Sequence, residues 1–232
     1  RLSIPAILFL SHYKGKTPFT LSGGQTKKLI SDSSWLFGVE ILAVAYFRID
    51  IFMLSKMANL YETGLYQAAY KIFDFGIAMF AGYLTAIFPA IARDSSRVRP
   101  GTLFKGAFIV FICLSLPLIL LRQELLSFFK PEYVQAAPVL TCLMLTLPFI
   151  YINSLLANFA VATSKIRRLF FVAMPLLAIN IGLNAELIPK YGILGSALAT
   201  LGSELLLSGI LVALLKPFAC TTSTPALCNK TI

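Results

Sequence analysis

The sequence of 232 residues is poor in the side chains that most enzymes use for catalysis or metal binding. It has a single histidine, His12, and its four cysteines, Cys113, Cys142, Cys220 and Cys228, form no CxxC pair. This spacing offers no zinc or redox motif. No G-x-S-x-G or H-E-x-x-H pattern supplies an activated nucleophile or a catalytic metal site. We therefore expect no metal ion and no cofactor, and we expect that the protein is not an enzyme.

Charged residues are also scarce, at 13% of the chain, while hydrophobic residues make up 58% and the mean hydropathy is +0.82. A soluble domain has about 25% charged and about 45–50% apolar residues. The apolar residues occur in blocks of about 20, the length that crosses a bilayer as a helix. Helices satisfy their own backbone hydrogen bonds, which lipid cannot do. We predict an all-α, polytopic membrane helix bundle with about six spans, at Ser34–Leu54, Gln67–Ala92, Leu103–Leu121, Val134–Val161, Arg168–Ile188 and Ile193–Leu215.

Basic residues account for the net charge of +10, and they concentrate in alternate loops between the apolar blocks. The loops near residues 11–33, 93–105 and 163–168 carry most of them, and the loops between these carry few. Such alternation is typical of membrane topology, and we do not expect nucleic acid as a partner. It predicts a multi-pass protein of the inner membrane, in contact with membrane lipids, with these loops and the C-terminus in the cytoplasm.

This pattern divides the chain into four parts. Residues 1–10 form an apolar stretch that is too short to span, and we interpret it as the end of a truncated transmembrane helix. Residues 11–33 are predicted to form a cytoplasmic loop with an interfacial segment, residues 34–215 a six-helix transmembrane lobe, and residues 216–232 a cytoplasmic tail. The sequence LSGGQ at residues 21–25 matches the signature of ATP-binding-cassette domains, but a loop of this length cannot hold that fold, so we interpret it as a coincidence.

The most informative residues are charged or polar side chains within the first two complete spans. A charge at mid-membrane costs at least about 2.5–3.5 kcal/mol, so it normally faces a partner or a wet cavity. Arg48 and Asp50 lie two residues apart and so project to nearly opposite sides of one helix. The second span has a polar stripe at helical spacing, opposite Phe73 and Phe80. We expect Arg48, Asp50, Lys71 and Asp74 to meet at similar depth. The predicted substrate- or ion-binding site is formed by Glu40, Arg48, Asp50, Gln67, Lys71 and Asp74.

Later spans carry isolated polar residues for which we expect hydrogen bonds between helices. Asn180 and Asn184 share one helix face. The last span has small residues on one face, which allow close helix packing. The polar set comprises Asn153, Asn158, Asn180, Asn184, Glu186 and Glu204.

Several stretches together resemble bacterial polysaccharide-biosynthesis flippases. These are Arg48-Ile-Asp50, Tyr61-Glu-Thr-Gly-Leu-Tyr-Gln-Ala-Ala-Tyr-Lys71, Ile87-Phe-Pro-Ala-Ile91, Phe129-Lys-Pro-Glu-Tyr133, and Asn184 followed by Ile188-Pro-Lys-Tyr-Gly192-Ile-Leu-Gly195. The flippases export O-antigen and other undecaprenyl-linked repeat units. They belong to the multidrug/oligosaccharidyl-lipid/polysaccharide exporter superfamily, whose members have a MATE-like fold of two six-helix lobes around a central cavity.

The resemblance implies that this chain is the C-terminal lobe of such a flippase. Its substrate would then be an undecaprenyl-pyrophosphate-linked oligosaccharide, flipped by alternating access. Arg48 and Lys71 would attract the pyrophosphate, and Asp50 and Asp74 would pair with them in the empty site or bind a coupling ion. The N-terminal lobe of the same protein and the glycan-assembly machinery would be its partners.

Four alternatives remain open at this point. A drug/cation antiporter of the same superfamily would have a cavity dominated by acidic residues. A membrane enzyme of glycan assembly would usually have a large outer loop, and the outer loops here are short. A non-transporting scaffold would need no cavity, and the charged side chains could also form a network that only holds two helices together.

Overall fold

The computed structural model describes residues 23–93, 100–162 and 165–215, and all the regular elements in these ranges are helices. The prediction of an all-α fold is therefore confirmed for the described residues. Residues 1–10 and 216–232, predicted as a helix end and a tail, lie outside them. The elements are α2 (Gly23–Met57), α3 (Leu60–Arg93), α4 (Pro100–Leu120), α5 (Arg122–Phe129), the 3-10 helix η1 (Pro131–Ala136), α6 (Ala137–Ala162) and α7 (Ile166–Leu215).

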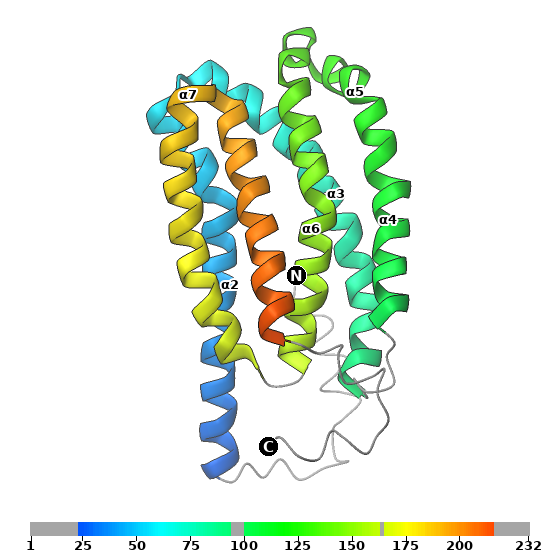
Figure 1. The fold of residues 1–232 in the computed structure, drawn as a ribbon, viewed down its shortest axis with the longest axis vertical. Coiled ribbons are helices and arrows are strands. Elements are labelled where there is room, and N and C mark those ends of the chain that lie inside the picture. The colour runs from blue at the N-terminus through cyan, green and yellow to red at the C-terminus, as the bar shows by residue number, and fades with distance from the viewer. Residues whose placement is uncertain (1–22, 94–99, 163–164, 216–232) are drawn as a thin grey trace, which may run out of the picture.

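The long helices run up and down side by side (Figure 1). The N-terminus of α2, the C-terminal ends of α3, α6 and α7, and the start of α4 lie at one end of the bundle. The junction of α2 and α3, helix α5 and the turn within α7 lie at the other end. Each of the six predicted spans falls on a helix of this bundle, except that Leu121 lies one residue beyond α4 and residues 134–136 lie in η1. The described helix ends that flank the basic loops of the sequence thus lie at the same end of the bundle.

Helix α2 begins at Gly23 and so includes residues 23–33, the last part of the predicted loop with its interfacial segment. Its first part extends beyond the ends of the neighbouring helices (Figure 1). The predicted boundary at Ser34 came from hydropathy, and hydropathy marks where a helix enters lipid rather than where it begins. The helix therefore continues past the apolar segment.

Helix α7 is a hairpin of two arms. A straight helix of 50 residues would be about 75 Å long, far more than the roughly 30 Å of a bilayer core. The chain reverses at Gly192, whose φ of 56° and ψ of −135° are not helical. Positive φ is accessible to glycine at little cost because it has no Cβ. We call residues 166–191 the first arm and residues 193–215 the second arm; they coincide with the last two predicted spans.

By length and composition, two helical segments of the described residues could cross a membrane, Pro131–Ala162 and Ile166–Ala213. A third is added if Lys105–Leu120 and Arg122–Phe129, which meet at an angle of 64°, form one span. Helices α2 and α3 are not among these segments. They are the two helices that carry the charged residues of the predicted site.

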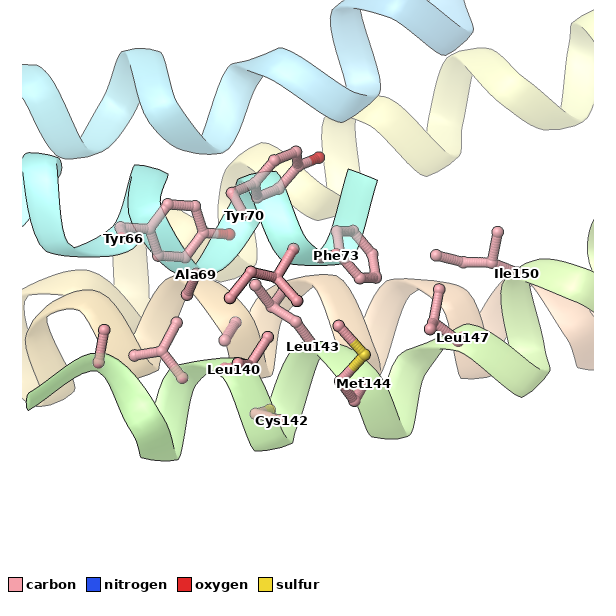
Figure 2. Close-up of a cluster of buried hydrophobic side chains, with 14 of the residues drawn as sticks. Tyr66, Ala69, Tyr70, Phe73, Leu140, Cys142, Leu143, Met144, Leu147 and Ile150 are labelled. Carbon is pink, nitrogen blue, oxygen red and sulfur yellow. The ribbon is translucent and has the colours of Figure 1, made fainter. Parts of the chain in front are cut away.

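The main core lies between α3 and α6. Figure 2 shows Phe73 of α3 directed toward Leu147 of α6, whereas the Tyr70 ring extends away from α6 and its hydroxyl bonds to α2. Further along the same two helices, the rings of Phe80 in α3 and Tyr151 in α6 stack with centroids 3.8 Å apart. One face of α3 is thereby buried, which leaves its polar stripe on the opposite side, outside the core.

Candidate functional site: a charged face on two helices

Arg48 of α2 and Asp74 of α3 form an ion pair between the two helices. Arg48 Nη2 lies 3.6 Å from Asp74 Oδ2, and the two side chains are 59% and 43% exposed. The guanidinium group also lies over the ring of Tyr70, 5.8 Å from its centroid. The Tyr70 hydroxyl donates a hydrogen bond to the Phe47 carbonyl (2.8 Å), which holds the ring against α2. Arg48 is therefore oriented by a ring and a carboxylate.

Two further predicted residues lie beside this pair on α3. Gln67 and Lys71 are exposed, and they precede Asp74 by about two turns and one turn of the same helix. Phe73 and Phe80, on the other side of α3, are buried. The predicted amphipathic stripe is thus confirmed. We call Arg48, Gln67, Lys71 and Asp74 the charged face.

Asp50 does not join the charged face. It is 2% exposed and accepts hydrogen bonds from the Tyr66 hydroxyl (2.6 Å) and from the backbone N–H of Ile51 (2.7 Å). The expectation that Asp50 meets the other ionisable groups is therefore wrong. The two-residue spacing from Arg48 correctly predicted different sides of α2, and the side of Asp50 is the one that packs against α3.

Glu40 is also separate from the charged face. It is exposed on α2, eight residues before Arg48, which corresponds to about 12 Å along the helix axis. The structure thus brings together four of the six predicted site residues. Asp50 lies in the packed interior, and Glu40 lies nearer the N-terminal end of α2.

A second polar group, around Glu204, lies inside the bundle. Glu204 of the second arm of α7 is 2% exposed. The side-chain amide of Asn153 in α6 donates to its carbonyl oxygen (3.0 Å) and to its Oε2 (2.7 Å). Ser208 donates to Asn153 Oδ1 at 2.9 Å. The buried Tyr46 hydroxyl of α2 lies near the Glu204 carboxylate but forms no hydrogen bond of good geometry with the described residues.

The two arms of α7 are joined by another set of polar contacts. Asn180 donates to Ser203 Oγ (3.0 Å), and Ser196 donates to Asn184 Oδ1 (2.8 Å). All four side chains are buried. The predicted bonds between helices are therefore confirmed for Asn153, Asn180, Asn184 and Glu204.

For the other two residues of that set the expectation is wrong. Asn158 donates within its own helix, to the Ser154 carbonyl (2.8 Å). Glu186 is exposed and pairs with Lys190, four residues further along the same arm. Both side chains find a partner at i±4, the spacing at which helix neighbours meet, so neither needs a second helix.

A cavity of about 160 Å³ lies between α2, α6 and α7. Its walls are mainly apolar, and Tyr46, Asn153 and Glu204 are polar exceptions. The sequence reasoning assigned Glu204 to helix packing and did not link it to a cavity. Within residues 23–93, 100–162 and 165–215, no group of three or more His, Cys, Asp or Glu side chains could hold a metal ion.

Replacing Asn153 with leucine is expected to lower the free energy of unfolding by about 1–3 kcal/mol, because it leaves the buried Glu204 carboxyl without its donor. Asn158→Leu is the matched control, since the Asn158 amide serves only its own helix, and it should cost less than about 1 kcal/mol. Unfolding by SDS titration, followed by circular dichroism, measures both. Equal costs for the two variants would show that the Asn153–Glu204 bonds contribute little.

Residues 2–94 match the family model described as polysaccharide biosynthesis protein. The comparisons with curated proteins and with solved structures gave no match. The matched segment contains α2, α3 and all four residues of the charged face.

Proposed function

We propose that the chain flips an undecaprenyl-pyrophosphate-linked oligosaccharide across the bacterial inner membrane, and the match of residues 2–94 to the family model described as polysaccharide biosynthesis protein supports this proposal. The observation that carries this proposal is the charged face, with two cations exposed on helices that the sequence predicts to span the bilayer. A charged group at this depth is costly unless a wet cavity receives it. The cargo needs such a cavity, because its sugars and pyrophosphate cannot enter the hydrocarbon core.

Arg48 is the residue that binds the pyrophosphate most directly in this proposal. A guanidinium group can hold two phosphate oxygens at once, and the Arg48 side chain is 59% exposed, with its guanidinium carbon 5.8 Å from the Tyr70 centroid. Lys71 adds a second positive charge on the same face. A flexible ammonium group suits a phosphate oxygen as a point charge.

Asp74 holds Arg48 when the site is empty. An exposed ion pair is worth about 0–1 kcal/mol, whereas a hydrogen bond between charged groups contributes about 1.5–3 kcal/mol. A pyrophosphate with several oxygens can therefore displace the Asp74 carboxylate. Asp74, or the buried Asp50, then becomes the carboxylate that takes a coupling proton or sodium ion.

The second half of the cavity comes from the N-terminal lobe of the same protein in this proposal. The charged face lies outside the core of the bundle and is open to such a partner. Rocking of the two lobes would expose the face alternately to the two sides of the membrane.

The experiment is a flipping assay with the full-length protein in vesicles, using a fluorescent undecaprenyl-pyrophosphate-linked oligosaccharide as cargo. We expect the cargo to become accessible to an added glycosidase in the opposite leaflet faster than in protein-free vesicles. A lipophilic cation such as ethidium, tested in parallel, should not be moved. Transport of ethidium without transport of the oligosaccharide would reject the proposal and favour a cation antiporter.

A further inference from the structure

Four side chains form an aromatic and cationic cluster where α2 and the first arm of α7 meet. Trp35 contacts Phe170 edge-on, with centroids 5.2 Å apart, and Phe171 in a tilted arrangement at 5.9 Å. The Arg167 guanidinium lies over the Trp35 ring, 5.2 Å from its centroid, and 6.0 Å from that of Phe171. Phe170 packs against the α2 backbone at Gly38, where a Cβ would lie 2.8 Å from its ring. We call these four residues the Trp35 cluster.

The hydrogen-bonding edge of Arg167 is available to a ligand. The guanidinium carbon lies 5.2 Å from the Trp35 centroid and the side chain is exposed, so N–H groups directed away from the ring can reach a ligand. Arg168, also exposed, and Lys165, partly exposed, add positive charge at the same end of α7. The chemistry that complements this arrangement is an anionic group with several oxygens, such as a phosphate.

The cluster lies at the predicted boundary between water and hydrocarbon. The apolar spans of the sequence begin at Ser34 and at Arg168, within one residue of Trp35 and Arg167. Exposed apolar side chains continue from the cluster along both helices. They are Phe37 and Ile41 on α2, 67% and 52% exposed, and Phe171 and Met174 on α7, 56% and 51% exposed.

We propose that the Trp35 cluster binds an anionic phospholipid of the cytoplasmic leaflet, with its phosphate on Arg167. Its acyl chains lie over the exposed apolar side chains of α2 and α7. The charge complementarity and the apolar surface directly beside the cations carry the proposal. It rests on the proposed orientation of the chain in the membrane, and it does not depend on the cargo that the protein moves.

Trp35 is the only tryptophan of the chain, so its fluorescence reports directly on the lipids at this site. The chain is reconstituted in phosphatidylcholine vesicles that contain a small, equal fraction of lipid with brominated acyl chains, either phosphatidylglycerol or phosphatidylcholine. Bromine quenches tryptophan on contact. One basic residue near an anionic lipid contributes about 1 kcal/mol, which corresponds to about fivefold enrichment. We therefore expect brominated phosphatidylglycerol to quench Trp35 clearly more than brominated phosphatidylcholine does.

Arg167→Gln should remove this difference, whereas Arg168→Gln, which changes an arginine outside the stack, should retain most of it. Arg167→Lys keeps the charge and loses the planar stack, so it should retain part of the difference. Circular dichroism verifies that each variant is folded. Equal quenching by the two brominated lipids in the unchanged chain would overturn the proposal. A difference that persists in folded Arg167→Gln would also overturn it, because Arg167 would then only hold the two helices together.

Discussion

Replacing Arg48 with alanine is expected to reduce oligosaccharide flipping by about ten- to a hundredfold. A hydrogen bond between charged groups contributes about 1.5–3 kcal/mol, and the variant loses it at the point where the pyrophosphate binds. The truncation leaves the fold intact, because the Arg48 side chain is 59% exposed and lies outside the core. The measurement is the initial rate of flipping in vesicles that contain equal amounts of protein. Lys71→Ala should also lower this rate.

Two further variants distinguish cargo binding from helix pairing. Arg48→Lys keeps the charge but cannot hold two oxygens in one plane, so it should flip at an intermediate rate. Asp74→Asn removes the competing carboxylate and should bind the cargo at least as tightly as the unchanged protein. If the Arg48–Asp74 pair only joined α2 to α3, Asp74→Asn would weaken cargo binding as much as Arg48→Ala does. Unchanged flipping in both Arg48→Ala and Lys71→Ala would reject their role in cargo binding.

Replacing Gly195 with alanine is expected to destabilise the α7 hairpin by about 2–3 kcal/mol. A Cβ at this position would lie 2.2 Å from the Leu187 carbonyl oxygen and 2.5 Å from its carbon. These are backbone atoms of the first arm, which cannot move aside as a flexible side chain can. Overpacking of this kind costs about 1–3 kcal/mol or more, and it exceeds the gain of up to about 1 kcal/mol that alanine brings to a helix.

Gly182→Ala is the matched control for the hairpin. Gly182 lies in the first arm, and a Cβ there would have no atom within 4 Å. This variant should be neutral or more stable by up to about 1 kcal/mol. SDS titration of both variants, followed by circular dichroism, gives the comparison. Similar stabilities for the two variants would contradict the close approach of the second arm to Leu187.

The polar stripe of α3 could be predicted from the sequence because it depends only on helical spacing. Gln67, Lys71 and Asp74 follow one another at intervals of four and three residues, and the helix places them together. The bundle and the hairpin could also be predicted, because the apolar blocks and the alternating basic loops can be identified directly in the sequence. Hydropathy located the predicted span at Ser34 and did not show that α2 extends back to Gly23.

The location of Asp50 and the environment of Glu204 could not be predicted in this way. Asp50 is bonded to Tyr66, 16 residues away, and Glu204 to Asn153, 51 residues away. Spacing within one helix shows which residues share a side, but it does not show which side faces a neighbour. That choice depends on how α2, α3, α6 and α7 pack, and no local pattern of the sequence records it.

Thiol labelling in the membrane tests most directly whether the charged face lines a wet interior. Gln67→Cys and Ala78→Cys place a thiol on this side of α3, in a full-length protein whose own cysteines are replaced by alanine. Met174→Cys, on the exposed apolar side of α7, serves as the lipid-facing control. A sulfonated maleimide, applied to both sides of the membrane, should label the two α3 positions but not position 174, and the oligosaccharide cargo should protect them. Failure of both α3 positions to react, as at position 174, would place the charged face against lipid and contradict the account.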